Sequence, residues 1–378
     1  MRFMDRVQLI VEAKICENFE KKISGICRIK YKLPTIGLYV LEAAETEVER
    51  LKGMEGVRSV RNDTCITAQA VRMDYTGAGI TIAILDTGVS LCDDLVRPRN
   101  RLLAFVDYVN GKSHPYDDNA HGTHVSCIAA GNGFLSHGRY RGTAPEANIA
   151  AIKILDENGR GNTADALAGI EWIIKNRRRY NIRVANLSIG TEDTGSSDPL
   201  VRAVEEAWDR GIVMCIAAGN NGPAPHSVTS PGISRKAITV GASDDFNHAD
   251  IWGNTLVNFS GRGPTSECIN KPDILAPGHD IISCLSSSPE MSAKRRSKLK
   301  IVAEHYVKMS GTSMASPMIA GAAALLLQKH PGLTPDEVKL MMKKSAKDLG
   351  QPGNRQGWGE IDIEKLLNLE VEYVRRKS

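Results

Sequence analysis

The sequence predicts an α/β protein with a doubly wound, mostly parallel β-sheet flanked by helices, preceded by a small α+β domain. Two observations predict the sheet. Short and almost continuously apolar runs recur between residues 80 and 240, as expected for strands that are covered on both faces. Amphipathic segments of helical periodicity separate these runs, and this alternation is typical of doubly wound sheets. The predicted strands are residues 80–85, 149–155, 184–188, 212–217 and 237–240.

Three helices can be read from their capping and periodicity. Residues 163–177 place four apolar side chains on one face. Asp198 followed by Pro199 is typical of a helix N-terminus, and Thr334 with Glu337 has the spacing of a capping box. The predicted loops are residues 110–119, 190–197 and 285–308, and the last includes a basic run from Lys294 to Lys300 that favours a solvated insertion.

Glycine content and the hydrophobic pattern divide the chain into two domains, residues 1–70 and residues 71–378. The first part has few glycines and reads as a small α+β unit, whereas the second carries the apolar strands. In the first part, strands are predicted over residues 7–13, 36–41 and 57–61, and a charged helix over residues 44–52.

Composition excludes several classes of protein. The formal net charge of the 378 residues is only +4, which is too small to indicate a nucleic-acid-binding protein. No apolar stretch is long enough to span a bilayer, and acidic residues interrupt the N-terminus where a secretory signal would be apolar. The eight cysteines form no CxxC pair, which disfavours a zinc site, and without an export signal we expect free thiols and a cytoplasmic protein.

Four short segments carry residues that could do chemistry. Asp86 ends an apolar strand, at the sheet edge where functional groups gather. His121 precedes an apolar helix and suits acid–base chemistry, with His124 as structural support. Asn220 follows another strand and could donate its amide to an oxyanion. Ser313 lies among small residues at a helix start, where the helix dipole favours developing negative charge.

Each segment also has a simpler explanation, in which the residue has only a structural role. Asp86 could only begin a turn, Asn220 could only stabilise one, and Ser313 could only cap a helix. The Asp-Thr-Gly around Asp86 also marks aspartic proteases, but that chemistry needs two such carboxylates and the chain has one Asp-Thr-Gly. His121 and His124 could share a metal, but a zinc site needs further ligands that the local sequence does not offer.

Taken together, the segments ILDTG, HGTHV, AAGN and GTSMASP resemble the motifs of the subtilisin-like serine proteases, over residues 76 to 365. Their triad runs in the chain order Asp, His, Ser. PYDDNAHGTHV, YRGTAPEANI, DPLVRAVEEAW and KPDILAPG further resemble the AprX-type alkaline serine proteases of bacteria. The resemblance implies a serine endopeptidase with Asp86, His121 and Ser313 as the triad, and Asn220 with the Ser313 N–H as the oxyanion hole.

The resemblance also implies how peptides bind. An extended substrate would add as a strand between two segments, one of Gly159, Arg160 and Gly161 and the other of Ser188, Ile189 and Gly190. Ala217, Gly219 and Thr229 would line the pocket for the residue before the scissile bond, and this uncharged lining predicts a preference for apolar side chains. Glu192 and Asp193 could add a preference for basic residues further along the peptide.

The first 70 residues resemble the inhibitory propeptide of the family, which implies an intramolecular inhibitor. The processing region would comprise Thr64, Cys65, Ile66, Thr67, Ala68, Gln69 and Ala70. Only 16 residues separate Ala70 from Asp86, which is short for the secreted members, so a prodomain that stays bound and a permanent structural domain are both open alternatives.

We expect no cofactor and no calcium at the position that secreted relatives use. The corresponding residues, 131–138, contain no carboxylate for a hard cation. Asp244, Asp245 and Asp250 could form a calcium site elsewhere, but this pattern is weak.

Two other functions compete with an active protease. A catalytically silent protein of the same fold could bind peptides or regulate, but the intact set of Asp86, His121, Asn220 and Ser313 argues against it. A nucleotide-binding enzyme has little support, because the glycines at residues 77–79 precede a strand and a dinucleotide fingerprint follows one. Protein or peptide substrates are therefore the expected partners, with no nucleic acid and no membrane.

Overall fold

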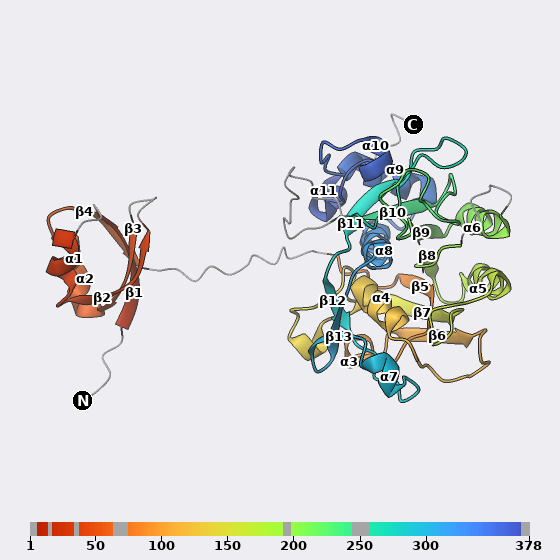
Figure 1. The fold of residues 1–378 in the computed structure, drawn as a ribbon, viewed down its shortest axis with the longest axis horizontal. Coiled ribbons are helices and arrows are strands. Elements are labelled where there is room, and N and C mark those ends of the chain that lie inside the picture. The colour runs from red at the N-terminus through yellow and green to blue at the C-terminus, as the bar shows by residue number, and fades with distance from the viewer. Residues whose placement is uncertain are drawn as a thin grey trace. The chain divides into compact units, whose positions relative to one another are not determined.

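The computed structural model describes residues 6–13, 17–33, 38–62, 75–191, 198–243 and 258–371. These residues form two compact units, an N-terminal unit within residues 1–72 and a C-terminal unit within residues 73–378 (Figure 1). None of the helices in the described ranges is both long and apolar enough to cross a membrane.

The N-terminal unit is a four-stranded sheet in the order β2-β3-β1-β4 with two short helices. β3 pairs antiparallel with both β1 and β2, and β1 pairs antiparallel with β4. Its core of apolar side chains includes Leu9, Leu41 and Leu51. The elements are β1 (Arg6–Ala13), α1 (Glu17–Ile23), β2 (Cys27–Leu33), β3 (Leu38–Ala44), the 3-10 helix η2 (Glu45–Glu47), α2 (Val48–Lys52) and β4 (Val57–Asn62).

The C-terminal unit is built on a seven-stranded sheet in the order β11-β10-β9-β8-β5-β7-β6. All six neighbouring pairs of strands run parallel, which confirms the predicted doubly wound α/β fold. The strands are β5 (Thr81–Asp86), β6 (Leu102–Asp107), β7 (Asn148–Lys153), β8 (Ile182–Leu187), β9 (Val213–Ala217), β10 (Ile238–Ser243) and β11 (Ile274–Pro277). Five of them lie where apolar runs predict strands.

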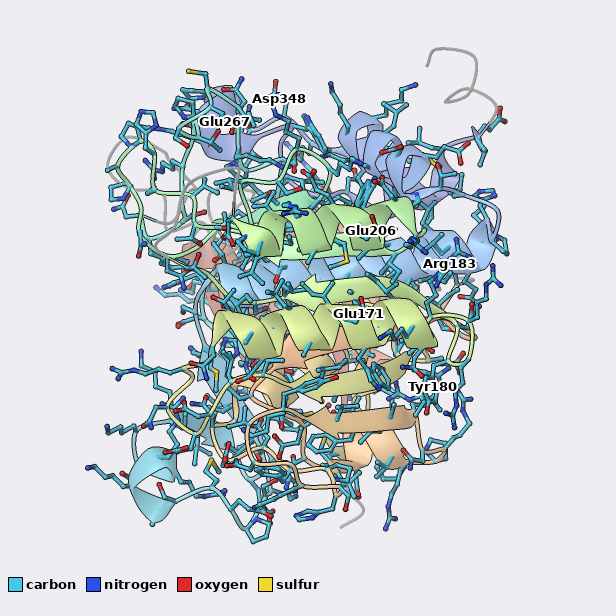
Figure 2. All side chains as sticks on the ribbon, turned by 90° about the vertical axis from the view of Figure 1, so that its right-hand side faces the viewer. Glu171, Tyr180, Arg183, Glu206, Glu267 and Asp348 are labelled. Carbon is cyan, nitrogen blue, oxygen red and sulfur yellow. The ribbon has the colours of Figure 1, made fainter. Side chains whose placement is uncertain are left out.

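Helices cover both faces of this sheet. α5 (Thr163–Asn176) and α6 (Pro199–Asp209) pack side by side on one face, and Figure 2 shows them in front of the sheet with Glu171 on α5 and Glu206 on α6. α4 (His121–Ala130) and α8 (Thr312–Lys329) pack against each other and against the sheet on the other face (Figure 1). Fifteen of the 18 residues of α8 are buried, which accounts for its run of small side chains.

The remaining elements of the C-terminal unit are short. They are α3 (Asp93–Val96), the 3-10 helix η3 (Phe134–Ser136), α7 (Ala293–Arg296), α9 (Pro335–Ser345), α10 (Gly353–Gln356) and α11 (Ile363–Asn368), with the strands β12 (Ile281–Cys284), β13 (Lys300–Ala303) and β14 (Tyr306–Met309). The predicted caps are present. Asp198 accepts a hydrogen bond from Leu200 N at the start of α6, and Thr334 with Glu337 forms a capping box at α9.

The prediction of a loop over residues 285–308 is wrong. This segment contains α7, β13 and β14, and β14 pairs with β12 and β13 in a small antiparallel sheet. All four residues of β13 are exposed, so the strand has no buried face and leaves no alternation of apolar and polar residues in the sequence. α1, β2 and β6 are also absent from the prediction. β6 is an edge strand with one fully buried residue, which explains its weak signal.

Candidate active site

The buried Asp86 and the partly exposed His121 form a hydrogen-bonded pair at the carboxyl edge of the sheet. Asp86 ends β5 and is 1% exposed, and His121 begins α4. Asp86 Oδ1 lies 2.7 Å from His121 Nδ1 and accepts a second bond from Thr87 N, also at 2.7 Å. An ionised carboxylate can only accept, so His121 carries its proton on Nδ1 and leaves Nε2 as the basic nitrogen.

The surroundings of His121 act on its pKa in opposite directions. Burial lowers the pKa of the imidazole, while the charge of Asp86 and the hydrogen bond to it raise this pKa. The net shift of the His121 pKa is upward. The arrangement therefore stabilises the imidazolium that forms when His121 accepts a proton.

A buried carboxylate that the sequence analysis missed organises the start of α4. Asp117 Oδ1 accepts hydrogen bonds from Thr87 Oγ1, Asn119 N and Ala120 N. Its Oδ2 accepts from Thr123 N and Thr123 Oγ1. Asp117 thus satisfies Thr123 N in the first turn of α4, which has no partner within the helix. With the bonds from Asn119 N and Ala120 N in the turn before α4, it fixes the backbone that presents the histidine. A carboxylate four residues before HGTH was the available signal.

Gly122 has to be glycine because α4 approaches the turn after β5 closely. A Cβ on Gly122 would lie 2.2 Å from Gly88 O and 3.2 Å from Asp86 Oδ1. Gly122 N also donates to Thr87 Oγ1 at 2.8 Å. This contact brings His121 within hydrogen-bonding distance of Asp86.

Ser313 lies in the first turn of α8, where the helix dipole favours negative charge. The residue is 9% exposed, and its carbonyl accepts a hydrogen bond from Ser188 Oγ at 3.2 Å. α8 packs on α4, the helix that begins at His121. The fold thus joins the serine segment both to the histidine helix and to the residue that follows β8.

Asn220 and the Ser313 N–H border one small space beside Gly311. A Cβ on Gly311 would lie 3.4 Å from Asn220 Nδ2 and 3.7 Å from Ser313 N. Asn220 Oδ1 accepts from Thr312 N at 2.9 Å and from Thr312 Oγ1 at 3.0 Å, which orients the amide. Among the described residues, no acceptor takes up Nδ2. Two N–H donors that border one space can bind an oxyanion.

The two segments predicted to bind an extended peptide line one cavity. Gly159, Arg160 and Gly161 lie on one side and Ser188, Ile189 and Gly190 on the other, around about 480 Å³. The remaining lining residues are Ile154, Leu155, Asn162, Thr163, Ala166, Thr191 and Leu200. The cavity is mostly uncharged, with Arg160 as its one ionisable residue.

Thr229 lies between two of the glycines predicted to contact substrate. A Cβ on Gly190 would lie 2.3 Å from Thr229 Oγ1, and a Cβ on Gly219 would lie 2.5 Å from the same atom. Ala217 is the buried last residue of β9, and Thr229 N donates to Ala218 O nearby. These residues form a narrow, uncharged region of the site.

The insertion around α7 reaches the segment that precedes His121. Arg295 donates from Nε to Asn119 O at 3.0 Å and from Nη2 to Asn119 Oδ1 at 2.7 Å. Asn119 Nδ2 in turn donates to Glu157 O at 2.9 Å. The basic run is predicted to be a solvated insertion, but Arg295 within it is partly buried and holds Asn119 in place. Its partner Asn119 is 2% exposed.

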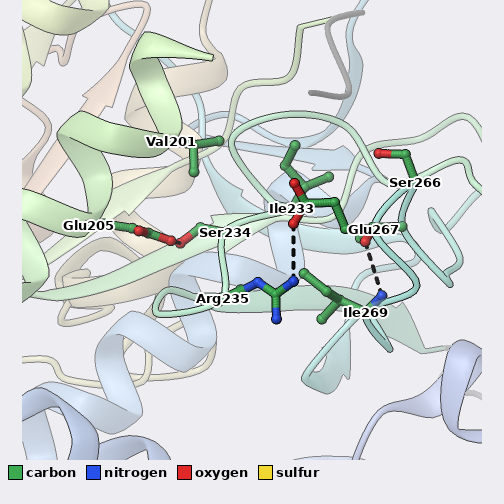
Figure 3. Close-up of a pocket in the computed structure, with 9 residues that line it drawn as sticks. Val201, Glu205, Ile233, Ser234, Arg235, Ser266, Glu267 and Ile269 are labelled. Atoms are coloured by element: carbon green, nitrogen blue, oxygen red, sulfur yellow. Dashed lines mark hydrogen bonds and ion pairs between the residues drawn. The ribbon is translucent and has the colours of Figure 1, made fainter. Parts of the chain in front are cut away.

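A second, smaller cavity lies away from these residues. It measures about 160 Å³ and is lined by residues of α6 and of the segments 233–235 and 265–269 (Figure 3). Its charged groups are paired, since Arg235 contacts Glu267 at 3.2 Å and Ser234 Oγ donates to Glu205 at 2.9 Å. None of the residues predicted to do chemistry lines it.

Several predicted residues lie outside the described residues. They are the processing region from Thr64 to Ala70, the acidic pair Glu192 and Asp193, and the carboxylates Asp244, Asp245 and Asp250.

His124 is a buried neutral histidine. Its Nε2 lies 3.1 Å from both Ile281 O and Val307 O, so this nitrogen donates its proton to carbonyls. Burial, and secondarily the charge of His121, lower the pKa of His124 to about 3. His124 therefore supports the packing of α4 on β12 and β14, as the sequence analysis expects of it.

The low pKa of His124 predicts acid instability. The unfolded chain binds this proton near pH 6.5 and the folded chain only near pH 3, so stability is complete above pH 6.5 and falls below it. Between pH 7 and pH 5 we expect a loss of about 2 kcal/mol from this group. Urea unfolding of Ser313→Ala and of Ser313→Ala with His124→Gln measures it. The double variant lacks the titrating group and should lose about 2 kcal/mol less; equal losses would contradict the assignment.

Comparison with known proteins shows which family and which relatives the chain resembles. The Peptidase_S8 model, of the subtilase family, matches residues 77–359. The chain is 46% identical to Serine protease AprX of Bacillus subtilis (strain 168) over 304 residues, 77% of this chain and 67% of that protein. It is 33% identical to Subtilisin BL of Lederbergia lenta over 290 residues, which are 76% and 91% of the two chains.

Two solved structures have a fold similar to that of this chain. The fold is similar to the structure described as S41 Psychrophilic Protease, with a TM-score of 0.63 and 30% identity over 76% of this chain and 92% of that one. It is also similar to a cold adapted subtilisin-like serine proteinase, with a TM-score of 0.58 and 28% identity over 80% and 92%. With a family model that covers most of the chain, the conclusion is direct: the chain belongs to the subtilase family and is a subtilisin-like serine endopeptidase.

Proposed function

We propose that Asp86, His121 and Ser313 hydrolyse peptide bonds of protein substrates through an acyl-enzyme. The hydrogen bond between Asp86 Oδ1 and His121 Nδ1 carries this proposal, because it leaves Nε2 free to act as base. His121 takes the proton of Ser313 as the hydroxyl attacks the carbonyl carbon, and returns it to the leaving amine. Water then attacks the acyl-enzyme, and His121 again transfers the proton.

Two donors stabilise the oxyanion in each half of the reaction. Asn220 Nδ2 and Ser313 N face the space beside Gly311, and the bonds from Thr312 to Oδ1 hold the amide in this orientation before substrate arrives. Preorganised donors need no rearrangement as negative charge develops, which is why they lower the barrier.

The first test of the proposed nucleophile is labelling by a fluorophosphonate, which reacts only with an activated serine. We expect one adduct per chain at Ser313, found by peptide mass spectrometry, and no adduct in Ser313→Ala or after heat unfolding. A folded wild-type chain without an adduct would favour the alternative function, a catalytically silent protein of the same fold that binds peptides.

Replacing Asn220 by alanine should lower kcat by about 10²–10³-fold, the loss that removal of one oxyanion-hole donor causes in such enzymes. KM should change little, because the Asn220 amide acts chiefly on the transition state. The melting temperature should fall modestly while the variant stays folded, because Thr312 N and Thr312 Oγ1 lose their acceptor. The measurement is steady-state hydrolysis of a chromogenic peptide. Asn221→Ala is a matched control from the same turn, and wild-type kcat in Asn220→Ala would remove this residue from the mechanism.

We also propose an apolar preference for the residue before the scissile bond. Ala217, Gly219 and Thr229 offer no charge to a basic or acidic side chain, whose burial without a partner is costly. Peptides that differ only at this residue test the preference, with Phe or Leu against Lys and Asp. A higher kcat/KM for Lys than for Leu would overturn it.

For the N-terminal unit we propose an intramolecular inhibitor that is cut from the C-terminal unit by Ser313 within the processing region, Thr64 to Ala70. The support is its resemblance to a propeptide and its compact, separate core. We further propose a reducing compartment, since the six cysteines within the described residues form no disulfide; they are Cys27, Cys92, Cys127, Cys215, Cys268 and Cys284. The absence of calcium at residues 131–138 stays a prediction.

A further inference from the structure

Three cysteines far apart in the sequence meet in the interior of the C-terminal unit. Cys92 precedes α3, Cys127 lies on α4 and Cys284 ends β12. Their sulfur atoms all lie within 4.8 Å of one another, and the Sγ atoms of Cys92 and Cys127 are 3.4 Å apart. The residues are 7%, 1% and 1% exposed. We call Cys92, Cys127 and Cys284 the thiol cluster.

A carboxylate adjoins the thiol cluster. Asp94 is fully buried, and its Oδ2 accepts a hydrogen bond from Cys284 Sγ at 3.3 Å and another from Tyr306 OH at 2.9 Å. Asp94 Oδ1 accepts from Leu135 N at 2.9 Å, which holds the carboxylate in place. Three sulfur atoms thus meet at one place, and a carboxylate oxygen lies against one of them, that of Cys284.

A buried cation lies next to this group. Arg101 is 3% exposed, and its guanidinium donates to the backbone oxygen of Asp94 and to Ala147 O at 2.8 Å. A positive charge here offsets the excess negative charge of several anionic ligands.

We propose that Cys92, Cys127 and Cys284 bind a zinc ion, with Asp94 as the fourth ligand. Zinc in structural sites prefers four ligands in a tetrahedron, with sulfur about 2.3 Å from the metal, which places pairs of sulfur atoms about 3.8 Å apart. The 3.4 Å between Cys92 Sγ and Cys127 Sγ is slightly below this value, and no pair of sulfur atoms in the cluster is more than 4.8 Å apart. Small side-chain movements would therefore bring the three sulfur atoms to one zinc ion, and Asp94 would turn toward it from its contact with Cys284. Each thiol loses its proton to solvent on binding, and no electron is transferred.

Two simpler arrangements account for less of the geometry. A disulfide between Cys92 and Cys127 needs its sulfur atoms about 2.05 Å apart, well below the 3.4 Å between them, and would leave Cys284 and Asp94 unexplained. Packing of thiols as small apolar groups does not account for a carboxylate buried against them.

The zinc ion would join the elements that carry the proposed catalytic pair. Cys92 belongs to the segment after β5, which ends at Asp86, and Cys127 lies on the helix that begins at His121. Because the ligands are buried, the metal has to enter as the chain folds. Removal of the ion should therefore loosen the packing of α4 on β5 and β12.

The experiment uses the tag-free, full-length Ser313→Ala chain, which cannot digest itself. After purification with zinc and dialysis, we expect one zinc per chain by plasma mass spectrometry, and loss of zinc in Cys127→Ser and Cys284→Ser. Cys215→Ser is the matched control, since Cys215 is also buried but lies in β9 outside the cluster. It should keep its zinc.

Cobalt provides a readout that does not depend on the folding of a variant. The chain refolded with Co²⁺ alone should show a thiolate-to-cobalt charge-transfer band in the near ultraviolet and the visible bands of a tetrahedral site. A refolded chain with neither zinc nor these bands overturns the proposal. So does a mass 2 Da below the reduced value with Cys92 and Cys127 joined, which would make the pair a disulfide.

Discussion

Replacing Ser313 by alanine is expected to lower kcat by about 10⁶-fold, because the whole triad acts through this hydroxyl. The methyl group of alanine fits the space, and the Ser313 N–H and the hydrogen bond from Ser188 to the 313 carbonyl use only the backbone. Folding should therefore be unchanged. Kinetics on a chromogenic peptide measure the loss, and the melting temperature and circular dichroism establish that the variant is folded.

The same variant tests self-processing. The wild-type chain should lose its first 64 to 70 residues, whereas Ser313→Ala should keep its full mass, as read by intact-protein mass spectrometry. Ser310→Ala, three residues earlier on the exposed side of the same segment, is the matched control and should be processed like the wild type. Processing of Ser313→Ala at the wild-type rate would mean that another protease makes the cut. Full-length wild type that still takes the fluorophosphonate would mean that the enzyme works with its N-terminal unit attached.

Replacing Asp86 by asparagine is expected to lower kcat by about 10⁴-fold. The amide has nearly the same shape, but its NH₂ group can donate to His121 Nδ1, which favours the tautomer with the proton on Nε2. That tautomer cannot accept the proton of Ser313. Because Asp86 Oδ1 serves both His121 Nδ1 and Thr87 N, an NH₂ group turned toward His121 leaves Thr87 N without this acceptor. The melting temperature should therefore fall modestly while the variant stays folded, which circular dichroism checks.

The pH profile separates this electrostatic role from a structural one. His121 must be neutral to act as base, so kcat/KM of the wild type should rise with pH through the raised pKa of His121. Without the Asp86 carboxylate, burial is the main influence that remains, and the pKa of His121 falls. The rising limb of Asp86→Asn should therefore move to lower pH. A limb that stays at the wild-type pH would show that Asp86 does not set the charge of His121.

The sequence predicted the parts of the fold that local physics determines. A strand buried on both faces has to be apolar along its length, so β5, β7, β8, β9 and β10 were visible as runs. Capping residues marked α6 and α9, since the first N–H groups of a helix need acceptors. The exposed β13 and the edge strand β6 lack such constraints and left no pattern.

The residues of the candidate site also fall into two groups, those that short motifs predict and those whose role depends on the fold. Asp86, His121, Asn220 and Ser313 stand in short motifs that resemble those of the family, and this resemblance predicted them as the site. The roles of Asp117 and Arg295 depend on partners that only the fold supplies, namely the N–H groups of the turn before α4 and the side chain of Asn119. The thiol cluster is the extreme case. Its members are separated by 35 residues or more. The sequence has no CxxC pair and therefore predicted no zinc site.

The burial of α8 has a consequence for how this enzyme is inactivated. Fifteen of its 18 residues are enclosed by the sheet and α4, so the helix cannot fray or tilt unless the surrounding core opens. The amide hydrogens that are bonded within the helix, beyond its first turn, should exchange with solvent only through opening of the entire C-terminal unit. Ser313 therefore cannot become disordered by local unfolding of its helix. It stays in position until the core unfolds, so activity and core structure should be lost in the same transition.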